Sequence, residues 1–214
     1  IVTVVPKTID PNDLPESLKG SDYYIIHLDE TSSTFIEDKI IEDLRPDDVN
    51  KFLYVWESTF IANTPGGLNF YGLAEGWISM IVGSVGWSGA GYFVGAGYGE
   101  IDMTNMYNTP EDYVFHIAVK SAQANTAYSL IFNDGVSEAK IVIGDVPIEG
   151  VDPYMDFTRD NEWQEIEIPV TYLRDLGVFY NQPFNEVNVL AFLAGGVAGT
   201  TLDMDAIFFY KKAE

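Results

Sequence analysis

The sequence contains no cysteine. This absence excludes disulfides, thiolate catalysis, zinc–sulfur sites and iron–sulfur clusters. Histidine is almost as scarce, because only His27 and His116 are present, and they lie in separate predicted strands that need not meet. A histidine-based catalytic triad or a histidine-rich metal site requires more than these two residues supply.

Basic residues are also few: 11 Lys and Arg stand against 33 Asp and Glu, which gives a formal charge of −22. Phosphate backbones and anionic membrane surfaces bind through clustered cations, so we expect neither nucleic acid nor lipid headgroups as partners. No apolar run approaches the roughly 20 residues of a spanning helix, so we expect no membrane insertion by this segment. The chain starts at Ile1 and not at Met, which is consistent with a mature or trimmed chain without its targeting segment.

Helical periodicity is limited to residues 11–20, 36–44 and 171–176, and the second of these could equally form an edge strand. Short alternating segments rich in β-branched and aromatic residues dominate instead. They predict an all-β fold, an antiparallel β-sandwich or jelly roll, in a single domain over residues 21–214. Residues 1–20 contain three prolines and read as an N-terminal arm or linker. The predicted strands are residues 23–30, 51–61, 76–87, 113–122, 127–134, 138–144, 163–170, 187–195 and 202–211.

A glycine-rich stretch over residues 82–100 holds seven of the 19 glycines. It has no Gly-Lys-Ser/Thr and no G-x-G-x-x-G that opens a helix, so it is not a phosphate loop. Glycine within strands relieves crowding or lets a backbone or ligand approach closely. Either Gly86, Gly89 and Gly91 satisfy tight packing, or the stretch forms a flat glycan surface. In the second case the stacking rings would be those of Trp87, Tyr92 and Tyr98.

Period-two alternation places further polar groups outward. His116 shares an outward face with Lys120, Ser129 and Asn133 in this interpretation, and imidazole, ammonium and amide groups can bind sugar hydroxyls. The alternative is a solvated face without a ligand. Trp56 has the same parity as its aromatic neighbours in its predicted strand, which favours a place in the core.

Two carboxylate pairs, Glu165 with Glu167 and Asp203 with Asp205, each lie on one face of a strand. Paired carboxylates perform glycoside hydrolysis when they are suitably separated. No recognisable glycosidase motif frames either pair. We therefore do not expect an enzyme.

Two C-terminal segments resemble a known family. WQEIEIPVTYL (163–173) and LDMDAIFFYKK (202–212) are similar to the closing strands of galactose-binding-like jelly rolls. With YVFHIAVKSA, LYVWEST and WSGAGYFV, the likeness over residues 21–214 is to the carbohydrate-binding domains of surface lipoproteins from polysaccharide-degrading bacteria. It implies glycan binding on a concave sheet face or loop rim and a structural Ca²⁺ at the edge, for which Asp29, Glu30 and Asp205 are the candidate ligands.

These observations lead to a first hypothesis of a noncatalytic module that binds an oligosaccharide or polysaccharide. It would act outside the cell or at the bacterial outer-membrane surface, with partner proteins in a surface complex, and it would require no cofactor besides structural calcium. A structural or adhesive β-sandwich that contacts proteins is the alternative. A glycoside hydrolase is the third.

Overall fold

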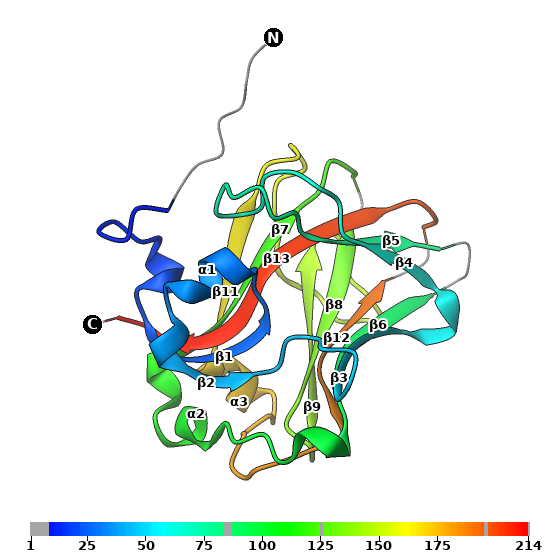
Figure 1. The fold of residues 1–214 in the computed structure, drawn as a ribbon. Coiled ribbons are helices and arrows are strands. Elements are labelled where there is room, and N and C mark those ends of the chain that lie inside the picture. The colour runs from blue at the N-terminus through cyan, green and yellow to red at the C-terminus, as the bar shows by residue number, and fades with distance from the viewer. Residues whose placement is uncertain (1–8, 84–86, 125, 195–196, 214) are drawn as a thin grey trace.

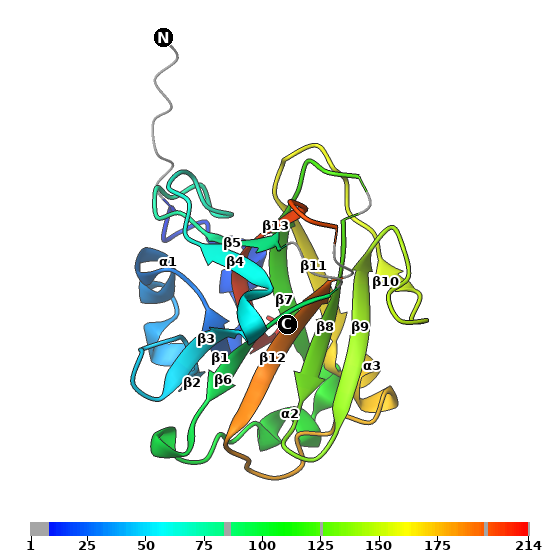
Figure 2. The same ribbon diagram turned by 90° about the vertical axis from the view of Figure 1, so that its right-hand side faces the viewer.

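The computed structural model describes residues 9–83, 87–124, 126–194 and 197–213. Two β-sheets pack face to face with a hydrophobic core between them (Figures 1 and 2). The predicted β-sandwich is therefore confirmed. All strand pairs are antiparallel except β1–β2 and β9–β10, which lie at opposite edges of the two sheets.

The first sheet has seven strands and contains both the first and the last strand of the chain. Its main order is β11-β7-β13-β1-β2, and β5 pairs with the far end of β13 and with β4. The strands are β11 (Gln164–Pro169), β7 (Tyr113–Lys120), β13 (Thr201–Lys211), β1 (Ser21–His27), β2 (Ile40–Asp43), β5 (Ile78–Val82) and β4 (Phe60–Asn63).

The second sheet has six strands in the order β10-β9-β8-β12-β6-β3. The strands are β10 (Pro153–Met155), β9 (Glu138–Gly144), β8 (Ala127–Asn133), β12 (Val187–Ala194), β6 (Ser88–Val94) and β3 (Lys51–Val55). The glycine-rich stretch thus supplies β6, a strand between two neighbours, which the sequence did not predict as a separate strand.

The helices are short. They are α1 (Glu30–Thr34), α2 (Thr104–Asn108), α3 (Val170–Asp175) and the 3₁₀ turns η1 (Glu16–Leu18), η2 (Glu37–Lys39), η3 (Trp56–Ser58), η4 (Ala96–Tyr98) and η5 (Pro110–Asp112). Of the three predicted helical segments, 171–176 matches α3, 11–20 contains η1, and 36–44 becomes η2 followed by the edge strand β2. Within the described ranges, the chain has no helix with the length and apolar character needed to span a bilayer.

The core between the sheets follows from alternation along each strand. In β7, Phe115, Ile117 and Val119 point inward and are fully buried. Phe115 meets Phe132 of the opposite sheet edge-on, with ring centroids 4.8 Å apart. Because every second residue of a strand faces the same side, these three side chains of β7 all point toward the six-stranded sheet.

A second hydrophobic cluster lies on the outer face of the seven-stranded sheet. Tyr23 of β1 and Phe208 of β13 point away from the main core, yet both are fully buried. The chain segments around Leu18 and Tyr71 cover them, and the Ser17 and Tyr71 hydroxyls are 3.0 Å apart beneath this cover. We call this surface the covered face.

The predicted strand at residues 51–61 is two strands in different sheets. β3 belongs to the six-stranded sheet and β4 to the seven-stranded sheet, and η3 joins them. Within η3, Glu57 and Ser58 have left-handed backbone conformations, with φ of 49° and 56°. This turn breaks the alternation, so the parity of β3 does not continue into Phe60.

Candidate functional site

The outer face of the six-stranded sheet carries several aromatic side chains that are not part of the core. Tyr54 of β3 is 55% exposed and Trp87, just before β6, is 46% exposed. Trp56, at the start of η3, is half-buried. The six strands of this sheet lie toward the viewer in Figure 2. We call this surface the open face.

Glycines form the floor beneath these rings. A Cβ atom added to Gly89 would lie 2.5 Å from Trp56 Cε3 and 2.9 Å from Trp87 Cζ3, so both indoles rest against this glycine. A Cβ atom on Gly91 would lie 2.5 Å from Asn188 Oδ1. Glycine is therefore required where the aromatic and amide side chains approach the sheet backbone.

Small side chains continue this floor across the sheet. Tyr54 pairs with Gly91, Gly91 with Ala191, and Ala191 with Ile131 across the four neighbouring strands β3, β6, β12 and β8. Lys140 of β9 follows next to Ile131 and makes an ion pair of 2.6 Å with Glu149. An aromatic edge and a polar edge thus border a row of low side chains.

A hollow of about 400 Å³ adjoins Trp87 at one end of the open face. This volume is within the usual range of ligand pockets, which starts near 300 Å³. Leu193 and Ala194 of β12 line it on one side, and the connection between β9 and β10 lines it on the other. The residues of that connection are Val146, Pro147, Ile148 and Glu149.

Thr59 fixes the position of the Trp56 ring. Its hydroxyl donates to the Trp56 carbonyl at 2.8 Å and accepts from the Gly89 backbone N–H at 2.9 Å. Its own carbonyl accepts from the Ser88 hydroxyl at 2.9 Å. These bonds attach the left-handed turn of η3 to β6, so Trp56 and Trp87 stay side by side although they are far apart in the sequence.

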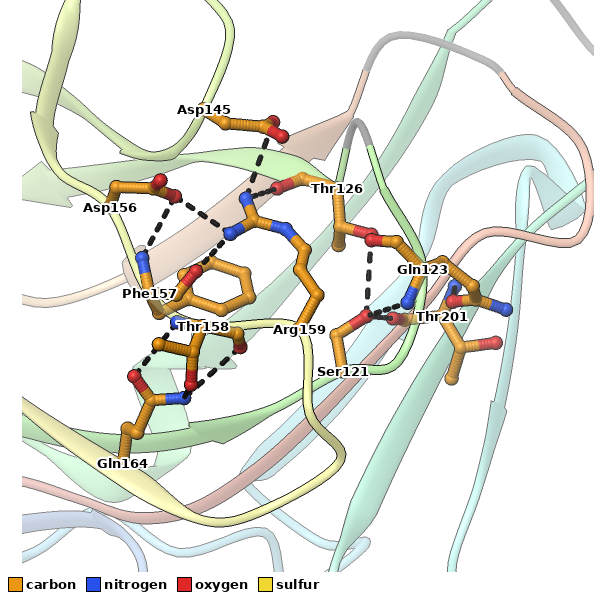
Figure 3. Close-up of polar contacts among 10 residues, drawn as sticks. All are labelled: Ser121, Gln123, Thr126, Asp145, Asp156, Phe157, Thr158, Arg159, Gln164 and Thr201. Atoms are coloured by element: carbon orange, nitrogen blue, oxygen red, sulfur yellow. Dashed lines mark hydrogen bonds and ion pairs between the residues drawn. The ribbon is translucent and has the colours of Figure 1, made fainter.

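Arg159 binds Asp145, which directly precedes the wall residues 146–149, and Figure 3 shows its polar contacts. Its guanidinium group lies 3.2 Å from the Asp145 carboxylate and 2.8 Å from the Asp156 carboxylate. It also donates to the Thr126 carbonyl at 2.8 Å and to the Phe157 carbonyl. One side chain therefore connects the β7–β8, β9–β10 and β10–β11 segments next to residues 146–149.

The open face can bind an extended polar ligand that has apolar faces. Indole and phenol rings stack on C–H surfaces, and amide, ammonium and carboxylate groups bind hydroxyls. Trp56 and Tyr54 were not predicted as ligand contacts, and the assignment of Trp56 to the core is wrong because Trp56 shares the outward parity of Tyr54, while Leu53 and Val55 pack against the core. The available signal was that residues 52, 54 and 56 are aromatic while Leu53 and Val55 are aliphatic, and amphipathic rings suit a wet face.

The structure separates the three aromatic residues proposed from the glycine-rich stretch. Trp87 is exposed beside Gly89, and its role stays a prediction. Tyr92 is 1% exposed and packs edge-on against Phe192 in the core, so it cannot stack on a glycan. The parity of β6 explains this correction, because Tyr92 points inward between Gly91 and Phe93. Gly86 lies outside the described residues.

Tyr98 and Asn133 lie at the other end of this sheet from Trp87. Tyr98 in η4 follows β6, packs against the core and donates to Glu42 Oε2 at 2.6 Å. Asn133 ends β8, donates to Glu138 Oε1 at 2.9 Å and accepts from the Gly135 N–H at 2.7 Å. Through these contacts, Tyr98 stabilises the segment that follows β6, and Asn133 stabilises the hairpin between β8 and β9.

The predicted polar face around His116 is wrong. β7 and β8 follow each other in the chain but belong to different sheets, so His116 and Asn133 lie on opposite sides of the sandwich. His116 is fully buried on the covered face and stacks on Phe208 with ring centroids 4.9 Å apart. Its Nδ1 lies 2.7 Å from the Ala206 carbonyl oxygen.

Both carboxylate pairs belong to the seven-stranded sheet. Glu167 accepts from the Tyr210 hydroxyl at 2.6 Å, and Glu165 lies 3.3 Å from His116 Nε2. Asp203 accepts from the Ser79 hydroxyl at 2.6 Å. None of these groups faces the open face, so the pairs do not border the aromatic surface.

The three proposed calcium ligands are only partly brought together. Oxygen atoms of Asp29 and Asp205 lie within 4.8 Å of each other and of a ring nitrogen of His27. Glu30, the first residue of α1, is exposed and is not part of this group of described residues. Burial, followed by the charge of Asp29, raises the pKa of Asp205 to about 7, and burial lowers the pKa of His27 to about 4.

No protein-family model and no curated protein matches the chain. Among solved structures, the family 30 carbohydrate-binding module of a cellulosomal cellulase of Clostridium thermocellum aligns with a TM-score of 0.50 at 17% identity, over 78% of this chain and 94% of that chain. The family 11 carbohydrate-binding module from Clostridium thermocellum, in complex with a β-1,3-1,4-mixed-linked tetrasaccharide, gives 0.46 at 12% identity, over 78% and 91%. At such identities the likeness shows the fold, which this chain shares with the family 30 module.

Proposed function

We propose that this chain is a noncatalytic carbohydrate-binding module that holds an oligosaccharide or polysaccharide on the open face. One observation supports this most directly: exposed aromatic rings stand over glycines on the open face, and among the described residues no second hydrophobic cluster covers it as one covers the other outer face. Rings held beside a floor without side chains leave room for a flat pyranose. The same fold occurs in the family 30 module, which is itself a carbohydrate-binding module.

The proposal extends to the setting of the protein. A module of this kind acts outside the cell or at the bacterial outer-membrane surface, within a polysaccharide-capture system that includes partner proteins. The strongly acidic surface suits neutral or basic glycans better than acidic ones, because like charges repel. Neutral plant polysaccharides are therefore the first ligands to test.

Affinity electrophoresis and calorimetric titration against a panel of soluble polysaccharides would test the proposal. We expect Trp87→Ala and Trp56→Ala each to cost on the order of 2 kcal/mol of binding free energy, as for an aromatic anchor at an interface. This corresponds to a roughly thirtyfold weaker affinity. Tyr107→Ala is the matched control, since Tyr107 is 39% exposed on α2, away from the open face.

Three outcomes would contradict the proposal. If no glycan binds, the alternative of an adhesive sandwich for protein partners is favoured. If both tryptophan variants fold and bind as tightly as the parent chain, the glycan site lies elsewhere. Release of reducing ends from the bound polysaccharide would show a hydrolase.

A further inference from the structure

The calcium site that the family resemblance implies does not fit the residues that the structure brings together. Ca²⁺ takes six to eight oxygen ligands in proteins. Here the group of described residues consists of the Asp29 and Asp205 carboxylates and a ring nitrogen of His27, and a nitrogen is not among the oxygen ligands of Ca²⁺. The nearby Leu28 carbonyl already accepts from the Arg45 guanidinium at 3.2 Å.

We propose that His27, Asp29 and Asp205 bind a first-row transition-metal dication, with Zn²⁺ as the representative ion. Zn²⁺ is commonly held by three protein ligands drawn from imidazole and carboxylate groups, and its fourth position can stay open. His27 Nε2 lies 3.8 Å from Asp205 Oδ1, and all three ligand atoms lie within 4.8 Å of one another. In a tetrahedral zinc site these separations are roughly 3.4 Å, so the three groups need to close only slightly.

The carboxylates are already oriented by neighbouring donors. Asp205 is fully buried and accepts from the backbone N–H groups of Phe70 and Ala206, at 2.9 Å and 2.8 Å. Asp29 accepts from the Asn69 side-chain amide at 2.6 Å. Such supporting hydrogen bonds hold metal ligands in place and are typical of built metal sites.

Two polar groups next to these carboxylates have no hydrogen-bond partner among the described residues. One is Nε2 of His27, the proposed ligand atom. The other is the hydroxyl of Tyr92, a side chain that is only 1% exposed. Tyr92, His27 and Asp29 line the same hollow of about 570 Å³, which gives an ion a path to the site.

The surrounding charge also favours a dication. The hollow is lined by four carboxylates, Asp29, Glu30, Asp43 and Asp47, and by two cationic side chains, Arg45 and Lys51. Within the described ranges, Asp205 forms no ion pair with a lysine or an arginine. A bound dication would join β1, β13 and the segment around Asn69 and Phe70, and so connect the first and last strands of the sandwich.

Calorimetry and thermal unfolding of the metal-free chain with Zn²⁺ or Ca²⁺ would test the proposal. We expect micromolar Zn²⁺ to raise the melting temperature, because a ligand that binds only the folded state stabilises it by mass action, and millimolar Ca²⁺ to leave it unchanged. His27→Gln and Asp29→Asn should each weaken Zn²⁺ binding at least about tenfold. Glu37→Gln is the matched control, since it removes an exposed carboxylate that does not line this hollow and should bind Zn²⁺ like the parent chain.

Co²⁺ absorption provides a measurement that does not depend on the stability of the variants. Co²⁺ in the parent chain should give visible bands of a four- or five-coordinate site with a nitrogen ligand, and these bands should change in His27→Gln. The proposal is overturned by any of these results: no Zn²⁺ binding, Zn²⁺ binding that His27→Gln and Asp29→Asn leave intact, or Ca²⁺ stabilisation that depends on Asp29 but not on His27.

Discussion

The two outer faces of the sandwich differ in what lies over them. On the covered face, Tyr23, Phe208 and Tyr210 point outward, but residues 9–18 and the segment around Tyr71 bury them completely. On the open face, Tyr54 and Trp87 remain exposed above glycines. Outward-facing aromatic residues therefore occur in two settings in this fold. On the covered face they pack against other large side chains and form a second core. On the open face they lie beside glycine and leave a surface that can receive a ligand.

The largest expected effect concerns the covered face. We expect Phe208→Ala to lower the free energy of unfolding by about 3–5 kcal/mol, because it leaves a cavity among packed aromatic rings. The same substitution at Phe93, which is half-buried on the open face, should cost less than half as much. Urea unfolding of both variants measures the difference, and equal costs would show that the covered face is not a second core.

Two glycines extend the comparison. A Cβ atom on Gly20 would lie 2.2 Å from the Lys211 carbonyl oxygen, so Gly20→Ala forces the backbone of the covered side apart. We expect a loss of about 1–3 kcal/mol in stability and no change in glycan affinity. The three atoms nearest to a Cβ on Gly89 belong to the side chains of Trp56, Trp87 and Leu193 and not to the backbone, so we expect Gly89→Ala to cost less than about 1 kcal/mol in stability.

For Gly89→Ala, glycan affinity should fall at least tenfold, because the added methyl group displaces the Trp56 and Trp87 rings from their positions against the β6 backbone. Thermal unfolding measures the stability of the Gly20→Ala and Gly89→Ala variants, and glycan titration measures the affinity of each. The distinction between the faces fails if Gly89→Ala unfolds the chain or if Gly20→Ala alone abolishes glycan binding.

The smallest expected effect is at the rim of the covered face. The hydrogen bond from His116 lowers the pKa of Glu165, with burial acting in the opposite direction. A depressed carboxyl pKa contributes stability above its unfolded pKa, and this contribution disappears as the pH falls through the folded pKa. Glu165→Gln should therefore cost less than about 1 kcal/mol at pH 7 and nothing in acid. Unfolding curves at both pH values measure this, and a cost that persists in acid would contradict the assignment.

The strands were predictable wherever one parity is apolar. The inward set of β7 and the β12 and β13 segments follow directly from alternation. The position of Asp29 near Asp205 was expected from the family resemblance, and the structure places their oxygens together. The first prediction follows from the local sequence alone, and the second follows from the expected proximity of the first and last strands of the domain.

Alternation could not predict which sheet each strand joins. For this reason His116 and Asn133 were placed on one face although they lie on opposite sides of the molecule. Nor does the sequence signal the turn at Glu57 and Ser58, since neither is a glycine or asparagine that would favour a left-handed backbone. If the strand is assumed to continue without that turn, Trp56 has the same parity as Phe60, which lies in the core. Trp56 is then assigned to the core, and the aromatic edge of the open face is not predicted.

The ion pairs of Arg159 have a thermodynamic consequence for ligand capture. Fixing the backbone of one mobile residue costs about 1–2 kcal/mol of conformational entropy, and a wall that became ordered only on binding would subtract this cost from the affinity. Because Arg159 already joins three connections beside residues 146–149, the free protein has this wall in its final shape. If the proposed glycan binds in this hollow, its affinity should be determined by stacking and hydrogen bonds, and its association rate by diffusion to a surface that is already formed.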